Sequence, residues 1–387
     1  VASGASLDIG GSLGSVYIGA LSGAGSLTAF SGTNLNVGGV GLNSDDTTFS
    51  GAINADYLAY DGLGTLTLSG TGSDIKQLIV CGCTSSGGIT LSGGSLTAAV
   101  GVGVSGQTFT VTDGVQLTTP DFEQGGGTVV ISGAGTTVDA TNSGSGLIAV
   151  YTTASRAPVF TISDGAQVTG DTLMSGLSGG TVAPQITVTG AASLLSLTNS
   201  VQLNDGTSLT VADGATLTTP SIDLDTNASL MIGTGALAGT VGDASTRIQG
   251  LSSGTSVVAN FTGDSTLGGF LTGALGLSVQ NGNLTLTNAS NDYSGGTTIG
   301  SGAVLTLKDS SAGTGAVSDA GFLAIQNSAA STFAYNLSGP GGLAQIGDGA
   351  LTINTAQVYA GSTVIAPNAT LFLTGGGDLS RSSGVEA

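Results

Sequence analysis

Thr110–Pro120 reads TVTDGVQLTTP, and almost the same phrase, TVADGATLTTP, returns at Thr210–Pro220. A looser copy, TISDGAQVTGD, lies between them at Thr161–Asp171, so the phrase recurs about every fifty residues. In each copy, apolar and polar residues alternate on both sides of an Asp-Gly pair, which is the period of strands that bury one face. Such a spaced strand–turn–strand repeat predicts a solenoid, in which one repeat makes about two or three coils.

The composition favours the same fold class. The chain of 387 residues contains 69 Gly but 6 Pro, and its charged fraction is 7%, far below the roughly 25% of ordinary globular domains. Polar residues or Gly interrupt every apolar run before it reaches the roughly 18 residues of a membrane-spanning helix. Short strands with frequent turns also fit a sandwich or a barrel, but the in-phase apolar ladder along the chain favours stacked coils. We therefore predict an all-β fold: a single-stranded, right-handed parallel β-helix.

The charge balance and the missing residue types exclude several functions. With 24 acidic and 5 basic residues the net charge is −19, which argues against nucleic acid and against an anionic membrane as partners. The chain has no His, so Ser-His-Asp and Cys-His mechanisms are impossible within it. We expect no enzymatic activity, no cofactor and no metal ion. Paired carboxylates could hydrolyse glycosides without His, and the dense pairs are Asp45/Asp46 and Asp56/Asp61.

Segments that break the repeat are candidate binding loops. Residues 43–61 concentrate acidic and aromatic side chains, and residues 147–159 and 321–340 carry further aromatic residues. We expect these segments to form surface loops, where binding groups usually lie. The alternative is that their tyrosines cap coils and their acids solvate turns. The binding-loop candidates are Asp45, Asp46, Asp56, Tyr57, Tyr60, Asp61, Tyr151 and Arg156.

Other patterns have simpler explanations. Asp113, Asp164 and Asp213 each precede a glycine, and we expect them to form turns rather than to bind ligands. Gly101 and Gly103 are also interpreted as turn residues, because no helix follows them to complete a phosphate-binding motif.

The two cysteines, Cys81 and Cys83, flank Gly82. They form either a local disulfide in an oxidising compartment or a pair of reduced thiols. A metal site would need more ligands than these two thiols.

One stretch carries a resemblance to a known family. Residues 282–307 read GNLTLTNASNDYSGGTTIGSGAVLTL, which resembles the passenger-associated transport repeat of type V autotransporters with pertactin-like β-helices. A weaker copy at Ala350–Leu373 places Tyr359, Gly361, Thr363 and Ile365 at matching positions, with either Gln357 or Val358 at the first. The matching core comprises Asn291, Tyr293, Ser294, Gly295, Gly296, Thr297, Thr298 and Ile299.

The resemblance implies an autotransporter passenger, on the surface of a Gram-negative cell or secreted from it. Its repeats would occupy residues 1–281, and residues 282–387 would form C-terminal coils that nucleate folding. The passenger would act as an adhesin that binds a host cell-surface or matrix protein or glycan, or that self-associates. Its own outer-membrane β-barrel is expected C-terminal to this chain. The alternatives are a secreted effector that engages a host receptor and, third, a carbohydrate-active β-helix enzyme.

Overall fold

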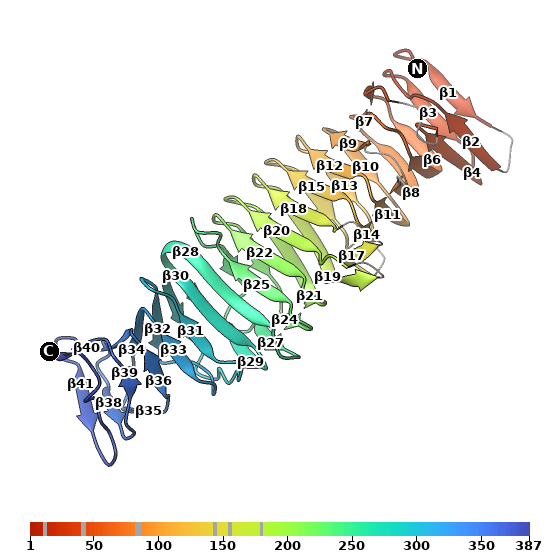
Figure 1. Cartoon of the computed structure of the whole chain (residues 1–387). Helices are drawn as coiled ribbons and strands as arrows, with labels where there is room; N and C mark the ends of the chain where they lie inside the picture. The colour runs from red at the N-terminus through yellow and green to blue at the C-terminus, as the bar shows by residue number, and fades with distance from the viewer. Residues whose placement is uncertain (11–13, 40–43, 82–86, 142–144, 154–156, 179–180) are drawn as a thin grey trace. The chain divides into compact units, whose positions relative to one another are not determined.

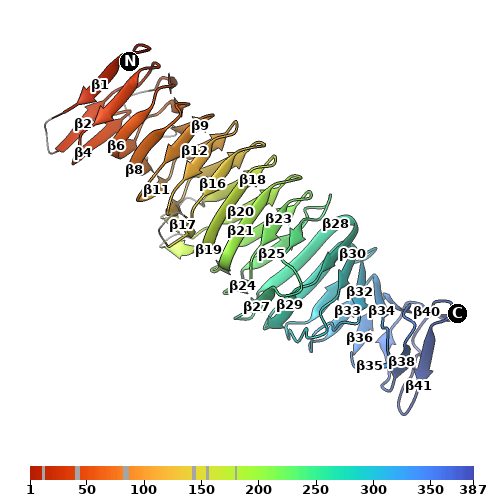
Figure 2. The same cartoon turned by 180° about the vertical axis from the view of Figure 1, so that it is seen from behind.

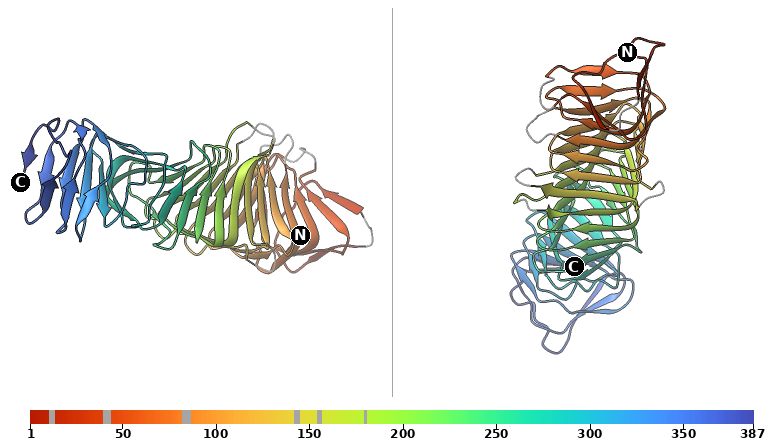
Figure 3. Two further views of the ribbon diagram at one scale, coloured as in Figure 1. Left: turned by 90° about the horizontal axis from the view of Figure 1, so that it is seen from below. Right: turned by 90° about the vertical axis from the view of Figure 1, so that its right-hand side faces the viewer.

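The chain folds as a parallel β-solenoid of about 17 turns, with 57% of its residues in strands and no helix among the residues that the structure describes. The predicted all-β solenoid is thereby confirmed, and its stacked strands are visible from several sides (Figures 1, 2 and 3). The computed structural model describes residues 1–10, 14–39, 44–81, 87–141, 145–153, 157–178 and 181–387, without the side chains of 177–178.

Two compact units divide the chain, Val1–Gln202 and Leu203–Ala387, and each is described by itself. The strands that begin in the first unit are β1 (Ser6–Ile9), β2 (Gly14–Ile18), β3 (Ser26–Ala29), β4 (Thr33–Val37), β5 (Thr47–Phe49), β6 (Ile53–Tyr60), β7 (Thr65–Leu68), β8 (Ser73–Cys81), β9 (Gly88–Ser92), β10 (Ser95–Thr97), β11 (Gly101–Ser105), β12 (Thr108–Thr112), β13 (Gln116–Thr118), β14 (Asp121–Gly125), β15 (Thr128–Ser132), β16 (Thr137–Asp139), β17 (Leu147–Thr153), β18 (Val159–Ser163), β19 (Gln167–Ser178), β20 (Gln185–Thr189) and β21 (Leu194–Leu203).

The second unit contains the strands that follow. They are β22 (Ser208–Ala212), β23 (Thr216–Thr218), β24 (Ser221–Leu224), β25 (Ser229–Ile232), β26 (Thr240–Val241), β27 (Arg247–Gly250), β28 (Ser256–Leu267), β29 (Phe270–Gly273), β30 (Gly276–Leu286), β31 (Thr297–Ile299), β32 (Val304–Lys308), β33 (Val317–Asp319), β34 (Phe322–Gln326), β35 (Ser331–Phe333), β36 (Leu337–Gly339), β37 (Gly342–Gln345), β38 (Ala350–Ile353), β39 (Val358–Tyr359), β40 (Thr363–Ile365), β41 (Thr370–Leu373) and β42 (Val385–Glu386).

Parallel pairing in the first unit explains the sequence repeat. Thr110 on β12 pairs with Val130 on β15, and Val130 pairs with Thr161 on β18. The first two copies of the repeat therefore lie two coils apart in the same ladder. Strands β13 and β16 form a second ladder, and β11, β14 and β17 form a third. Each coil in this region thus contributes three short strands.

The inward side chains of these strands form a continuous apolar core. Phe109, Phe122 and Phe160 are each at most 1% exposed, and their rings stack in sequence with centroid separations of 5.9 and 5.8 Å. Fully burying one such side chain contributes about 1.5–3 kcal/mol. The second unit follows the same rule, since Leu305, Leu323 and Leu343 pair across three coils and are fully buried.

The Asp-Gly pairs form the predicted turns. Asp113, Asp164 and Asp213 have φ of 58°, 56° and 55°, the left-handed region that Asp tolerates better than most residues. The turn prediction is thus confirmed for these three residues. The predicted boundary between residues 281 and 282 lies within β30, and a separate folding role for residues 282–387 stays a prediction.

Candidate functional site

The acidic and aromatic segment is mostly strand, so the expectation of a surface loop is wrong for it. Residues Ile53–Tyr60 form β6, which pairs with β4 and β8. Tyr60 is fully buried, and its hydroxyl donates a hydrogen bond to the Gly64 carbonyl oxygen at 2.7 Å. Burial raises the pKa of Tyr60, and the nearby charge of Asp46 adds to this shift. Tyr60 is therefore a core residue that a partner cannot reach.

Asp56 connects neighbouring coils. Its Oδ1 lies 2.6 Å from Lys76 Nζ, and its Oδ2 accepts hydrogen bonds from Ser31 Oγ at 3.0 Å and from the Gly32 amide at 3.1 Å. The Lys76 bond, followed by those from Gly32 and Ser31, lowers the pKa of the Asp56 carboxyl. Through these bonds Asp56, which is on β6, connects the residues just before β4 with β8, so its role is structural.

The remaining candidates of this segment are partly engaged. Asp46 Oδ1 accepts a hydrogen bond from the Thr65 amide at 2.7 Å, and Asp45 and Asp61 also have interaction partners. Tyr57 points outward from β6 and is half-buried; burial, with a smaller contribution from Cys81, raises its pKa. Asp45 and Asp46 are exposed, so they and Tyr57 stay candidates for contact with a partner.

Gly101 and Gly103 lie inside β11, so the interpretation of them as turn residues is wrong. Val102 and Val104 point into the core and are 2% exposed, which directs the two glycine positions outward. β11 pairs with β8 on one side and β14 on the other (Figure 1). The sheet face is therefore hollow along β11, where two consecutive outward side chains are missing.

We call this hollow the glycine trough: Gly101 and Gly103 form its floor, and its walls are Gln77 and Ile79 on β8 and Asp121 and Glu123 on β14. Its volume is about 140 Å³. The two acids are two residues apart on one strand, so their side chains leave the same face about 6.6 Å apart.

Both carboxylates of the trough have polar neighbours. Asp121 Oδ1 accepts hydrogen bonds from the Ser145 hydroxyl and, at 3.4 Å, from the Leu147 amide. Tyr151, on β17, lies close to Glu123. Burial raises the pKa of Tyr151, and the neighbouring Glu123 carboxylate adds to the effect. The predicted binding residue Tyr151 thus lies beside the trough, whose floor and acidic wall were not predicted from the sequence.

Two further candidates, Cys83 and Arg156, are not among the described residues. Cys81 is the half-buried last residue of β8, whereas Cys83 lies outside the described residues, so the disulfide stays a prediction. Arg156 also lies outside the part of the chain that the structure describes.

The transport-repeat motif forms a buried corner. Tyr293 is fully buried, and its hydroxyl shares a hydrogen bond of 2.7 Å with Thr297 Oγ1. Asn291 Oδ1 accepts a hydrogen bond from the Leu271 amide of the preceding coil at 2.9 Å. Burial raises the pKa of Tyr293 far above its ordinary value. A side chain at Gly295 would lie 2.6 Å from the backbone of the preceding coil.

The rest of the motif completes this corner. Ser294 Oγ donates a hydrogen bond to the Gly273 carbonyl oxygen at 3.1 Å. Gly296 has φ of 88°, and Ile299 is buried in the core, whereas Thr298 is exposed. Most of the motif is therefore used for packing the coil.

The weaker copy builds the same corner. Tyr359 is 1% exposed, and its hydroxyl lies 2.6 Å from Thr363 Oγ1. Gln357 Oε1 accepts a hydrogen bond from the Leu337 amide at 3.2 Å, which is the role of Asn291 in the first copy. Gln357, rather than Val358, therefore takes the first position of the motif.

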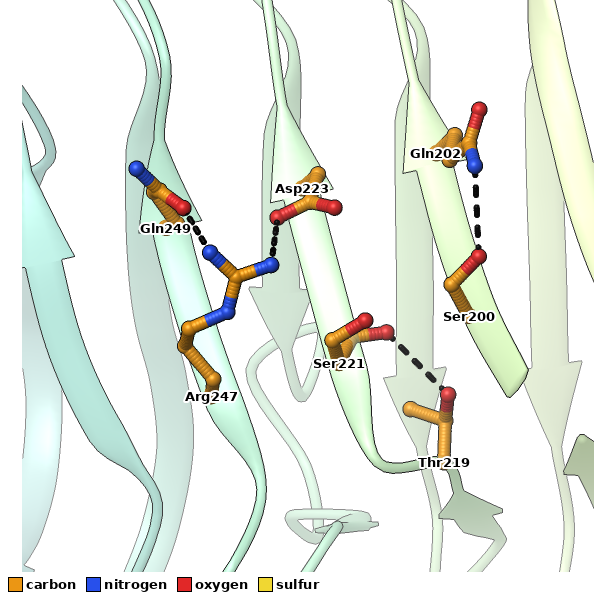
Figure 4. A network of polar contacts seen from close by, with 7 residues as sticks. All are labelled: Ser200, Gln202, Thr219, Ser221, Asp223, Arg247 and Gln249. Atoms are coloured by element: carbon orange, nitrogen blue, oxygen red, sulfur yellow. Dashed lines mark hydrogen bonds and ion pairs between the residues drawn. The ribbon is translucent and has the colours of Figure 1, made fainter. Parts of the chain in front are cut away.

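Polar side chains on the outward strands of the second unit were not predicted as a site (Figure 4). Arg247 on β27 lies across from β24, with Nη2 2.9 Å from Asp223 Oδ1, and its Nη1 donates to Gln249 Oε1. In the first unit, Gln202 Nε2 donates to Ser200 Oγ at 3.3 Å within β21. The alternation of apolar and polar residues in the sequence predicts that these side chains point outward. Only the strand register shows which of them contact one another.

A second hollow, of about 390 Å³, lies beside Tyr335. The Tyr335 hydroxyl accepts a hydrogen bond from the Ala312 amide at 3.0 Å and donates one to Ser311 Oγ at 3.2 Å. Its ring packs edge-to-face on Phe333, with the centroids 5.3 Å apart. None of the described residues that line this hollow carries a charge.

Within the described ranges, no group of three or more Cys, Asp or Glu side chains is arranged to hold a metal ion. Nor does that part of the chain contain a helix long and apolar enough to span a membrane. No protein-family model, curated protein or solved structure matches this chain.

Proposed function

We propose that this chain is an autotransporter passenger that acts as an adhesin at the surface of a Gram-negative cell, or after release from it. The observation that carries this proposal is the buried corner built twice in the second unit. In both copies a side-chain amide oxygen accepts from the preceding coil, and a tyrosine hydroxyl bonds a threonine four residues later. This motif resembles the repeat that accompanies passenger secretion.

The adhesive role is supported by the outward faces of the solenoid. Parallel strands present their outward side chains in ladders with a spacing of about 4.8 Å, which suits many weak contacts in parallel. Asp223, Arg247 and Gln249 form one such polar group in the second unit. Because each contact is weak, the proposed adhesin binds through their number rather than through one deep pocket.

Beads coated with the folded chain test the adhesive role. We expect them to adhere to cultured host cells, to immobilised matrix proteins or to one another more strongly than beads coated with the heat-denatured chain. Adhesion equal to that of the denatured chain on all three surfaces would refute the proposed function. A fusion to an outer-membrane translocator tests the passenger role separately, through protease accessibility on intact cells.

A further inference from the structure

The two glycines of the trough are not required by the fold. Neither has the positive φ that favours glycine, and among the described residues the atom nearest to a Cβ at Gly101 would be the Asp121 carbonyl oxygen, at 3.5 Å. At Gly103 the close neighbour is the Cδ1 atom of Ile79, at 2.9 Å, which is the movable end of a side chain. Glycine weakens a strand interior, and it often marks a place where a ligand or another backbone approaches closely.

The dimensions of the trough match one extended polypeptide. β8 and β14 flank β11, so the backbones of the two walls are about 9.6 Å apart, twice the spacing of paired strands. An extended peptide lying along β11 would place alternate side chains about 6.6 Å apart on one face. Asp121 and Glu123 have the same spacing, so two alternate side chains of the peptide can each face one carboxylate.

The chemistry of the walls selects the side chains. Ile79 is half-buried, and Val100 at one end of the trough is 55% exposed, so part of the lining is apolar. The opposite wall carries Asp121 and Glu123. Lys and Arg bury an aliphatic stem while their charged head stays at a polar edge, which fits this combination. A net charge of −19 also draws basic partners toward the chain.

The contacts already made to the carboxylates orient them and leave room for a ligand. A carboxylate has about four acceptor positions. Glu123 lies close to the Tyr151 hydroxyl, and Asp121 accepts from Ser145 and Leu147. Each therefore keeps acceptor positions for a guanidinium or ammonium group.

We propose that the glycine trough binds an extended segment of a partner protein that carries Arg or Lys at alternate positions. This inference rests on the proposed adhesive function and names the chemistry of its partner. The side-chain stems lie over Gly101 and against Ile79, whose Cδ1 atom covers the Gly103 position, and the two cationic heads bind Asp121 and Glu123.

Fluorescence anisotropy with a labelled Gly-Arg-Thr-Arg-Gly peptide tests the inference on the full chain. Gly101→Val fills the floor, and we expect it to weaken binding at least tenfold without lowering the unfolding midpoint, since Val suits a strand better than Gly. Gly101→Ala should have an intermediate effect. Glu123→Gln should weaken binding about fivefold. Asp74→Asn, an exposed acid on β8 outside the trough, is the matched charge control and should bind as the unaltered chain does.

Three outcomes would overturn the inference: no binding of the peptide, equal binding by Gly101→Val and the unaltered chain, or equal losses in Glu123→Gln and Asp74→Asn. Binding of a Gly-Asp-Thr-Asp-Gly peptide with the same affinity would also refute the charge argument. If Gly101→Val lowers the unfolding midpoint, the peptide affinities of Glu123→Gln and Asp74→Asn decide whether the trough binds the peptide. The bead assay separates the two proposals, because adhesion that survives Gly101→Val refutes the trough alone, whereas absent adhesion by the unaltered chain refutes the adhesin.

Discussion

Asp319 makes the stability of the second unit depend on pH. Its side chain is fully buried at the end of β33, where Ile299 of the preceding coil pairs with it. Oδ1 accepts a hydrogen bond from the Gly321 amide at 2.8 Å, whereas Oδ2 has no hydrogen-bond partner among the residues that the structure describes. Burial of this carboxyl, only partly offset by the nearby amides of Gly321 and Leu323, raises its pKa from 3.8 to about 6.

The direction of the effect follows from the two pKa values. Below about pH 4 the carboxyl is protonated in both the folded and the unfolded chain, so it contributes no pH dependence. Between about pH 4 and pH 6 the unfolded chain loses the proton while the folded chain keeps it, and stability falls as pH rises. Above about pH 6 the loss is complete, and about two pKa units correspond to about 3 kcal/mol.

Asp319→Asn removes this titration. At each pH we compare the free energy of unfolding of the variant with that of the unaltered chain. We expect this difference to favour the variant by up to about 3 kcal/mol more at pH 7.5 than at pH 4. Urea unfolding followed by circular dichroism across this pH range measures the difference. The test is how this difference in unfolding free energy changes with pH. Any effect of Asn on packing is the same at each pH and therefore cancels. Asp348→Asn, an exposed acid of the same unit, is the control. Parallel pH profiles for Asp319→Asn and the unaltered chain would refute the reasoning.

Three further predictions concern single bonds and the C-terminal coils. Tyr293→Phe removes a buried hydrogen bond and should lower the free energy of unfolding by about 1 kcal/mol in urea titrations; an unchanged midpoint would contradict the role given to this hydroxyl. Asp56→Asn should destabilise the chain at pH 7, and the deficit should shrink below about pH 4, because the Lys76 contact lowers the pKa of Asp56. Deleting residues 282–373 should slow refolding of the upstream coils after dilution from denaturant, and a fragment of residues 1–281 that refolds like the full chain would sink this expectation.

The fold was predictable because the repeat and the core share one period. Thr110 and Thr161 occupy the same ladder, and the spacing of the repeat in the sequence is the length of two coils. The second motif copy was less clear, because Gln replaces Asn at its first position. Gln is one methylene longer, yet its amide oxygen accepts from the equivalent backbone amide, that of Leu337, so a change in sequence preserves the contact.

β6 was missed because its alternation changes phase. Ile53 and Ala55 point inward before Asp56, and Leu58 and Tyr60 point inward after Tyr57, so the two-residue period shifts by one at the middle of the strand. A polar pair at such a shift resembles a loop in the sequence. In the structure it is a bend at which Asp56 bonds to adjacent coils.

The glycine trough could not be predicted for a different reason. The alternation of Gly101–Ser105 indicates a strand with valines inward and glycines outward. Whether the glycines form a hollow depends on the side chains of the two flanking strands, which the alternation does not identify. The number of residues in the intervening coil sets the register in which Gly103 pairs with Glu123. One added residue in the turn between them would bring Phe122 or Gln124 opposite Gly103 and direct the carboxylate elsewhere. The chemistry of this site therefore lies in the register between coils rather than in any contiguous motif, and variants with a lengthened turn should lose peptide binding while all of the trough residues remain.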